Sequence, residues 1–280
     1  MDSYSLIPEE EPMQKNPIHM SPRPSKHKPD EIRTYKKVAD RSLKAHLFFP
    51  KDRSASGGSP AFVFFHPGGW QMGEPEWGYD LCHRYASSGV IAISFQYRLS
   101  SIGGYSPAEA VSDAKSAVRW TREVAAELDM DSTRVVAGGI SAGGHLAACA
   151  AVLPEPDDTG PSCVPDALAL QSTPVNPVID NHFVELLQGR DSPEKFSPAH
   201  HVRPGLPPMC LIHGTADEIV PHDSVKDFVT RMREAGNRCE LHSFEGTDHF
   251  FMKNPNPARV TELMDDFFSG LGYMEKSKKG

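Results

Sequence analysis

The fold of this chain is decided by residues 135–148, which read VVAGGISAGGHLAA. A run of small and β-branched residues passes through Gly-x-Ser-x-Gly into an alanine-rich segment, and this pattern predicts a buried strand that turns sharply into a helix. Ser141 stands at the apex of the turn. A strand that reverses over about three residues forces its apex toward positive φ and brings backbone against backbone, so Gly139 and Gly143 are needed for space.

The same turn would give Ser141 the geometry of a nucleophile. Its hydroxyl would stand clear of the sheet, and the first amides of the following helix would point at the same space with a partial positive charge. This arrangement is a nucleophile elbow. Because a five-residue pattern also occurs in ordinary glycine-rich loops, the rest of the chain has to support the assignment.

Composition places the chain among globular proteins. It has 280 residues, of which 39% are hydrophobic and 24% are charged, and its net charge is -8; such values are typical of globular domains. The lysines and arginines are scattered, without the basic patch that a nucleic acid or an anionic membrane requires. No segment approaches the roughly 18 apolar residues of a membrane helix. We therefore expect no nucleic-acid partner and no membrane span.

The cysteines and the first residues bear on cellular compartment. The five cysteines are widely spaced and form no C-x-x-C pair, so neither a disulfide framework nor a zinc site is predicted. Residues 1–20 are polar and lack the continuous apolar region of a signal peptide. As it stands, the sequence indicates a cytoplasmic protein. A secreted or periplasmic location would require that a signal segment had been removed.

Strand and helix signals alternate along most of the chain. Residues 1–30 are rich in proline and charge without any period, which predicts an extended or disordered leader. Two short runs within 31–49 predict an antiparallel hairpin. Further on, buried apolar runs alternate with amphipathic helical patterns, which predicts parallel strand pairing. Strands are expected at 61–65, 90–95, 135–140, 167–171, 209–213 and 239–244, and helices at 79–88, 106–128, after 141, at 225–235 and at 260–271.

These elements predict one α/β domain over residues 31–280. A single doubly wound, mostly parallel sheet that opens with an antiparallel hairpin accounts for all of them. The helix near residue 107 has the clearest start, because Ser106, Pro107 and Glu109 combine an N-cap, a first-turn proline and a capping box. Residues 172–208 are irregular and rich in proline. In a compact domain such a segment predicts a small lid or binding loop.

The candidate functional residues lie in loops that follow the strands, where ligands gather in such sheets. The loop after the strand at 61–65 reads HPGGW. Its glycines allow backbone amides to converge on one point, as an oxyanion hole requires. We therefore predict that Gly68 and Gly69, together with the amide of Ala142 after the nucleophile, form that hole.

Two later loops supply an acid and a histidine. The stretch HGTADEIVP places Asp217 directly after a buried strand, and GTDHF places His249 after the outer strand. Glu218 adjoins Asp217, but successive residues of such a turn point in different directions, so only one carboxylate should face the site. We predict Ser141, Asp217 and His249 as the catalytic residues, in the chain order Ser, Asp, His.

Three aromatic residues near the predicted mouth of the site are candidates for substrate binding. We expect Trp70, Trp77 and Tyr79 to line an acyl or sugar pocket. Other conspicuous residues are given structural roles, because a lone histidine or an arginine near an aspartate more often stabilises a fold than acts on a ligand. These residues are His66, His145, His200, His201, Arg98 with Asp113, and Trp120.

The combined motifs resemble the esterase/lipase branch of the α/β-hydrolase fold. The resemblance covers about residues 35–271 and is strongest to small carboxylesterases and acetyl-xylan-esterase-like enzymes, which are related to hormone-sensitive-lipase-type esterases. Pro67 departs from this branch, which usually has glycine there, and lacks an amide, so the oxyanion role would fall on the next two residues. Asp248 also departs, since a small residue is commoner before the histidine. The resemblance rests on Tyr97-Arg98-Leu99, Pro107-Ala108, Asp113, Trp120, residues 139–147, Ser197-Pro198-Ala199 and residues 213–217.

The resemblance implies a serine esterase for short-chain acyl esters that works through an acyl-enzyme. His249, oriented by Asp217, would take the proton of Ser141, and neither a metal nor an organic cofactor would be needed. The segment 172–208 offers little apolar surface for a lipase lid, which favours short acyl chains. The expected substrate is a small-molecule or oligosaccharide ester, with acetylated carbohydrate as one candidate.

Other functions remain open at this stage. An arylformamidase-type amide hydrolase resembles the chain in its glycine- and tryptophan-containing loop and its Ser-Ala-Gly elbow. A prolyl-peptidase-type hydrolase would need a propeller domain, for which the chain has no room. A hydrolase-fold binding protein without catalysis usually lacks a member of the triad, whereas all three are present in this chain.

Overall fold

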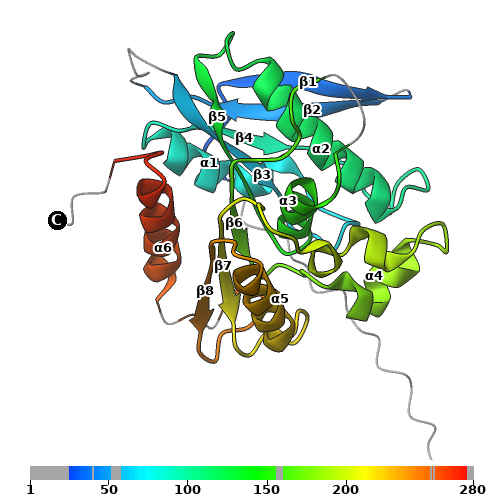
Figure 1. Cartoon of the computed structure of the whole chain (residues 1–280). Helices are drawn as coiled ribbons and strands as arrows, with labels where there is room; N and C mark the ends of the chain where they lie inside the picture. The colour runs from blue at the N-terminus through cyan, green and yellow to red at the C-terminus, as the bar shows by residue number, and fades with distance from the viewer. Residues whose placement is uncertain are drawn as a thin grey trace, which may run out of the picture.

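A computed structural model describes residues 25–275, except for 40, 52–57, 156–159, 253 and 255. Most of the leader expected at 1–30 lies outside the described residues. Among the described residues, eight strands form one sheet in the order β1-β2-β4-β3-β5-β6-β7-β8 (Figure 1). The strands are β1 (Glu31–Val38), β2 (Arg41–Phe48), β3 (Ser59–Phe65), β4 (Ile91–Phe95), β5 (Met130–Ile140), β6 (Ala167–Gln171), β7 (Met209–Gly214) and β8 (Cys239–Phe244).

The direction of the strands confirms the predicted topology. β1 pairs with β2 and β2 with β4 in antiparallel fashion, and all later pairs are parallel. The helices are α1 (Tyr79–Ala86), α2 (Pro107–Glu123), α3 (Ala142–Val152), α4 (Asn181–Leu186), α5 (His222–Glu234) and α6 (Pro257–Gly270). No helix in the described part of the chain is long and apolar enough to cross a membrane.

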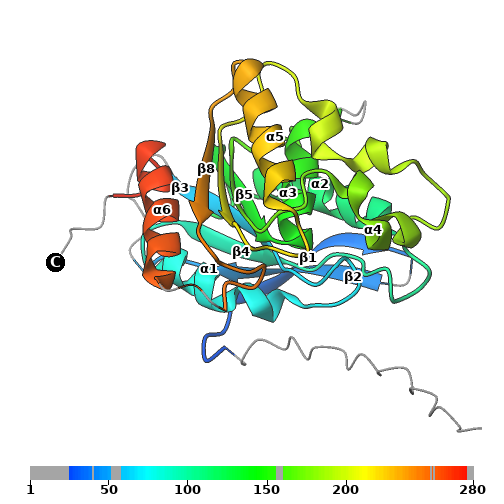
Figure 2. The ribbon, with the colours of Figure 1, turned by 90° about the horizontal axis from the view of Figure 1, so that it is seen from below.

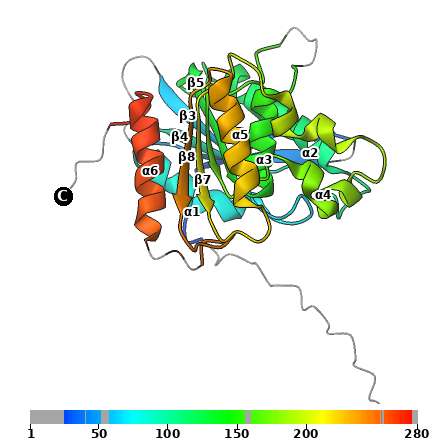
Figure 3. The same ribbon diagram turned by 60° about the horizontal axis from the view of Figure 1, so that its bottom comes forward.

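Helices cover both faces of the sheet and enclose a hydrophobic core on each. α2, α3 and α5 lie on one face, and α1 and α6 lie on the other (Figures 2 and 3). β3 shows why the sheet has a core on each face, because successive side chains of a strand point to opposite faces. Phe62 and Phe64 pack with α1 and α6, whereas Val63 and Phe65 pack on the other side.

Local signals explain where α2 begins and how its start is anchored. The Ser106 hydroxyl accepts a bond from the Ala108 amide, and the Glu109 carboxylate accepts one from the Ser106 amide at 2.7 Å, which completes the predicted capping box. Arg98 pairs with the buried Asp113 of this helix at 2.8 Å. The structural role expected for this ion pair is thus confirmed.

The segment 172–208 is more regular than the sequence suggested. It contains α4 and three short 3-10 helices, η2 (Pro177–Ile179), η3 (Pro193–Phe196) and η4 (Pro198–His201). Asp180 caps α4 by accepting bonds from the amides of His182 and Phe183. Each helix is too short to show a hydrophobic period, so sequence periodicity alone could not reveal them. α4 lies on the α2–α3 side of the molecule, far from α6 (Figures 1 and 2).

Candidate active site

The predicted turn at Ser141 is present between β5 and α3. Ser141 has φ 53° and ψ −123°, a backbone conformation that non-glycine residues rarely adopt. A Cβ added to Gly139 would lie 2.4 Å from the Gly143 carbonyl carbon, and one added to Gly143 would lie 2.0 Å from the Phe65 carbonyl oxygen. Both glycines are therefore required by close backbone contact.

The structure brings Ser141, His249 and Asp217 into one hydrogen-bonded chain. The Nε2 atom of His249 lies 2.9 Å from the Ser141 hydroxyl oxygen, and its Nδ1 lies 2.8 Å from Asp217 Oδ2. Asp217 and His249 are buried, whereas Glu218 is exposed. Of the two neighbouring acidic residues, only Asp217 faces the histidine, as the sequence predicted.

The environment of Asp217 favours its ionised form. Burial would raise the pKa of this carboxyl group, but hydrogen bonds from His249 and from the Val220 amide outweigh burial, so the pKa is lowered. The amides of Ile219 and Val220 donate to Oδ1 at 3.0 and 2.8 Å. A fixed carboxylate keeps the proton of His249 on Nδ1, so that Nε2 faces the Ser141 hydroxyl as an acceptor.

His213 is a member of this cluster that sequence reasoning did not single out. It is 1% exposed, and its Nε2 lies 2.9 Å from the Val220 carbonyl oxygen and 3.2 Å from Asp217 Oδ2. Burial lowers its pKa, which keeps the ring neutral. The sequence signal for this residue was its position at the end of β7, four residues before Asp217.

Residues 66–73, called the oxyanion loop from here on, carry two of the three predicted oxyanion donors. Gly68 and Gly69 have φ values of 132° and 57°, which glycine adopts without strain. Within the described part of the chain, the amides of Gly68, Gly69 and Ala142 have no hydrogen-bond acceptor. These amides are therefore available for a ligand.

Aromatic stacking anchors the start of the oxyanion loop. The His66 ring stacks on Tyr97 with 4.2 Å between ring centroids, and the Tyr97 hydroxyl donates to the His66 carbonyl at 2.9 Å. A Cβ on Gly73 would lie 2.4 Å from His66 Nδ1. His66 thus braces its own loop, as expected.

The predicted aromatic lining requires correction. Tyr79 is buried on the α1–α6 face, with its hydroxyl 2.5 Å from His46 Nδ1 and its ring against Phe48, so it does not line the mouth of the site. Trp70 is 3% exposed and packs in the core. Trp77 is half-buried, with its ring centroid 6.1 Å from that of His66. All three residues were predicted to line the pocket because they are close in sequence to the oxyanion loop. Trp70 of that loop and Tyr79 of α1 instead point into the core.

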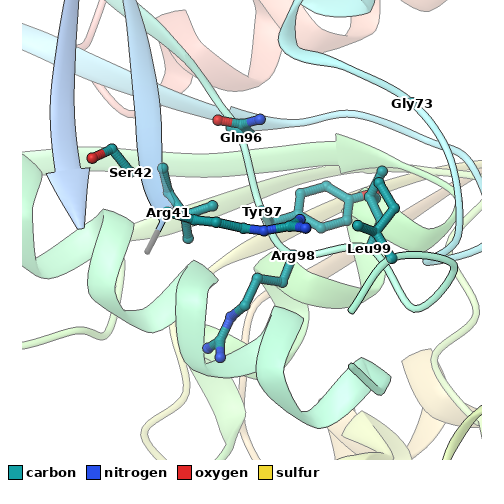
Figure 4. A pocket seen from close by; sticks show the side chains of 9 residues that line it. Arg41, Ser42, Gly73, Gln96, Tyr97, Arg98 and Leu99 are labelled. Atoms are coloured by element: carbon teal, nitrogen blue, oxygen red, sulfur yellow. The ribbon is translucent and has the colours of Figure 1, made fainter. Parts of the chain in front are cut away.

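A cavity of about 270 Å³ lies beside the oxyanion loop and touches it at Gly73. The Arg41 side chain extends along this cavity toward Tyr97, whereas the guanidinium of Arg98 points toward α2 (Figure 4). None of the predicted catalytic residues lines it. The lining residues are Arg41, Ser42, Leu43, Gly73, Gln96, Tyr97, Arg98, Leu99 and Ile102.

The sheet and the elbow define an α/β-hydrolase, and comparison with known proteins narrows this class. The BD-FAE family model matches residues 46–187, and the Dienelactone hydrolase family model matches residues 196–279. The chain belongs to the BD-FAE family of α/β-hydrolases and is a carboxylic ester hydrolase. The predicted fold class and enzyme class are thereby confirmed.

Solved structures agree with this assignment. Esterase 2 of Thermogutta terrifontis with bound propionate is 37% identical, with a TM-score of 0.81 over 89% of this chain and 96% of that chain. The butyrate-bound structure of that enzyme is 36% identical, with a TM-score of 0.82 over 89% of this chain and 96% of that chain. The structure phosphorylated by paraoxon is 38% identical, with a TM-score of 0.81 over 88% of this chain and 96% of that chain.

Curated relatives are also esterases. A probable isoprenylcysteine alpha-carbonyl methylesterase of Arabidopsis thaliana is 26% identical over 79% of this chain and 51% of its own length. Carboxylesterase NlhH of Mycobacterium tuberculosis is 31% identical over 65% of this chain and 63% of its own length. The chain thus spans between half and two thirds of the length of these relatives.

Proposed function

We propose that the chain hydrolyses short-chain acyl esters through Ser141, His249 and Asp217 by way of an acyl-enzyme. The observation that carries this proposal is the continuous hydrogen-bonded chain of 2.9 and 2.8 Å that joins the three side chains. Ser141, at one end of this hydrogen-bonded chain, lies in a strained turn at the carboxyl end of β5. The carboxyl ends of the strands are where α/β sheets bind their ligands.

The proposed reaction proceeds in two acyl transfers. His249 Nε2 takes the proton of Ser141 as the serine oxygen attacks the ester carbonyl, and the amides of Gly68, Gly69 and Ala142 stabilise the oxyanion. The imidazolium then gives this proton to the leaving alcohol, which leaves the acyl group on Ser141. Water, activated by the same imidazole, releases the acid and restores the serine.

Two observations support a short acyl group. The segment 172–208, which we propose as a binding loop, supplies one six-residue helix, α4, and a Cβ on Gly69 would lie 3.6 Å from Nε2 of His182 on that helix. We infer that this segment, close to the oxyanion loop, limits the length of the acyl chain. The similar Thermogutta enzyme has been solved with propionate and butyrate. For the alcohol half, we propose acetylated carbohydrate, with Trp77 as the aromatic residue that would contact it.

Aryl esters of rising acyl length test this function, with Ser141→Ala as the matched control. We expect the rate to be highest for acetyl to butyryl esters, and Ser141→Ala to lower turnover by about 10⁶-fold because it removes the nucleophile. Retention of most activity in Ser141→Ala would refute the mechanism. A higher rate on a decanoyl ester than on the acetyl ester would refute the short-chain preference. Acetylated xylo-oligosaccharides and N-formylkynurenine in the same assay separate a carbohydrate esterase from an arylformamidase.

A further inference from the structure

A buried imidazole outside the proposed triad joins three segments around the nucleophile. His145 lies on α3, one turn after Ser141, and is 0% exposed. Its ring contacts Trp70 of the oxyanion loop and the carbonyl of Phe196, which ends η3 in the segment 172–208. The imidazole therefore lies where the oxyanion loop, the nucleophile helix and the proposed binding loop meet.

The hydrogen bonds define the protonation of this imidazole. The indole N–H of Trp70 can only donate, so His145 Nδ1, at 3.2 Å, must be the acceptor. Nε2 then carries the proton and donates to the Phe196 carbonyl at 2.7 Å. Burial lowers the pKa of His145 to about 4, which keeps the ring in this neutral form. Both ring nitrogens are engaged, and neither is available to a substrate.

Trp70 is held in a backbone conformation that it would not adopt by preference. Its φ is 60°, in the left-handed region that large side chains rarely occupy. The Ser100 amide donates to its carbonyl at 2.8 Å, its ring packs on Phe183 with 4.8 Å between centroids, and its indole is fixed by His145. Gly69 directly precedes Trp70, so movement of the Trp70 backbone would move the amides of the oxyanion loop.

The geometry points to His145 as a positioning residue for the oxyanion hole, which holds Trp70 and, through Trp70, the amides of Gly68 and Gly69. This role rests on the function proposed above. Oxyanion donors accelerate a reaction only when they are aimed at the place where charge develops, and a misplacement of about 1 Å can cost on the order of 10²-fold in rate. His145 thereby affects the chemical step without touching the substrate.

Substitutions of His145 and Trp70, singly and together in the full chain, test this role. H145L removes the acceptor, and W70F removes the donor while keeping an aromatic ring. We expect kcat on an aryl acetate to fall about 10- to 100-fold in each variant, with KM within about threefold. The kcat of the double variant should be no lower than that of the less active single variant, because the two substitutions remove the same contact. H145N should recover kcat to within about threefold of the unsubstituted protein, since its amide oxygen can accept the indole N–H.

Rates are compared per active site, counted by complete titration with a fluorophosphonate, so that loss of folded protein is not taken for loss of catalysis. Cys149→Ala is the matched control, because the Cys149 thiol lies 3.3 Å from both the Phe196 carbonyl oxygen and His145 Nε2, whereas the Trp70 indole donates to the other ring nitrogen, Nδ1. It should keep kcat. If H145L does not fold, W70F alone decides.

Retention of kcat within about twofold in W70F would overturn this role. The same holds if the losses in the two single variants multiply in the double variant, or if Cys149→Ala loses as much as H145L. Failure of the proposed function gives a different result, since Ser141 would then not react with the fluorophosphonate in any variant.

Discussion

At the scale of single residues, orientation separates Asp217 from Glu218. The two carboxylates adjoin in sequence, yet Asp217 is buried and accepts hydrogen bonds from Ile219, Val220 and His249, whereas Glu218 is exposed. The choice between them was predictable, because a tight turn after a strand points successive side chains apart. The position of His213 at the end of β7 was visible in the sequence, but its 3.2 Å distance to the acid was not, since that distance depends on how the turn closes.

Replacement of each carboxylate tests this difference. Asp217→Asn should lower kcat/KM by about 10⁴-fold, because an amide at that position no longer holds the proton of His249 on Nδ1. Glu218→Gln, next to it, should change kcat/KM by less than about threefold. Steady-state kinetics on an aryl acetate provide the measurement. Equal losses in the two variants would contradict the assignment of the acid.

At the scale of elements, strong local signals gave the start of α2 and the turn at Ser141, whereas α2 ends at Glu123 rather than at 128, and short elements escaped prediction. The capping box at Ser106 and the glycines of the elbow act within a few residues, so the sequence reveals them. α4 and the 3-10 helices of 172–208 depend on burial of single residues such as Phe183 and Phe196. Tyr79 was misplaced for a related reason: the pattern of α1 shows an apolar face but not which side of the sheet it will cover.

The capping box offers a test of this local logic. Ser106→Ala removes the acceptor of the Ala108 amide and should lower the free energy of unfolding by about 1 kcal/mol. Ser116→Ala in the middle of the same helix is the control and should leave stability equal or slightly raised, because alanine favours helix interiors. Urea denaturation measures both. A loss at Ser116 as large as that at Ser106 would contradict the role of the cap, and kcat should be unchanged in both variants.

At the scale of the whole molecule, the sequence predicted one mostly parallel sheet and the structure confirms it, because long buried runs alternating with helices admit few other arrangements. The substrate was less predictable. It depends on which side chains face the site after folding, and two of the three expected lining residues face the core instead. The esterase relatives of the chain and the solved esterase structures support ester hydrolysis.

Stability should depend on pH through buried histidines. Burial lowers the pKa of His66 and of His145 from 6.5 to about 4. Between these values the unfolded chain binds protons that the folded protein does not, so the free energy of unfolding should fall as pH falls, by up to about 1.4 kcal/mol per pH unit for each histidine. The contribution of these histidines to the loss should level off below about pH 4. Urea denaturation between about pH 7 and about pH 5 measures this slope.

A substitution of His145 shows how much of this pH dependence of stability comes from that residue. His145→Asn removes one of the histidines whose pKa is lowered by burial, so its stability should fall less steeply with decreasing pH than that of the unsubstituted protein. An identical slope in the two proteins would show that His145 is protonated in the folded state and would contradict its neutral form.

The central claim is that Ser141 is the nucleophile of an ester hydrolase, and mapping of a covalent adduct tests it most directly. After inactivation with an organophosphate ester such as paraoxon, peptide mass spectrometry should find one phosphorylated residue, Ser141, in proportion to the activity lost, and no adduct on Ser141→Ala. Loss of activity with the adduct on another residue, or full activity with Ser141 phosphorylated, would contradict the claim.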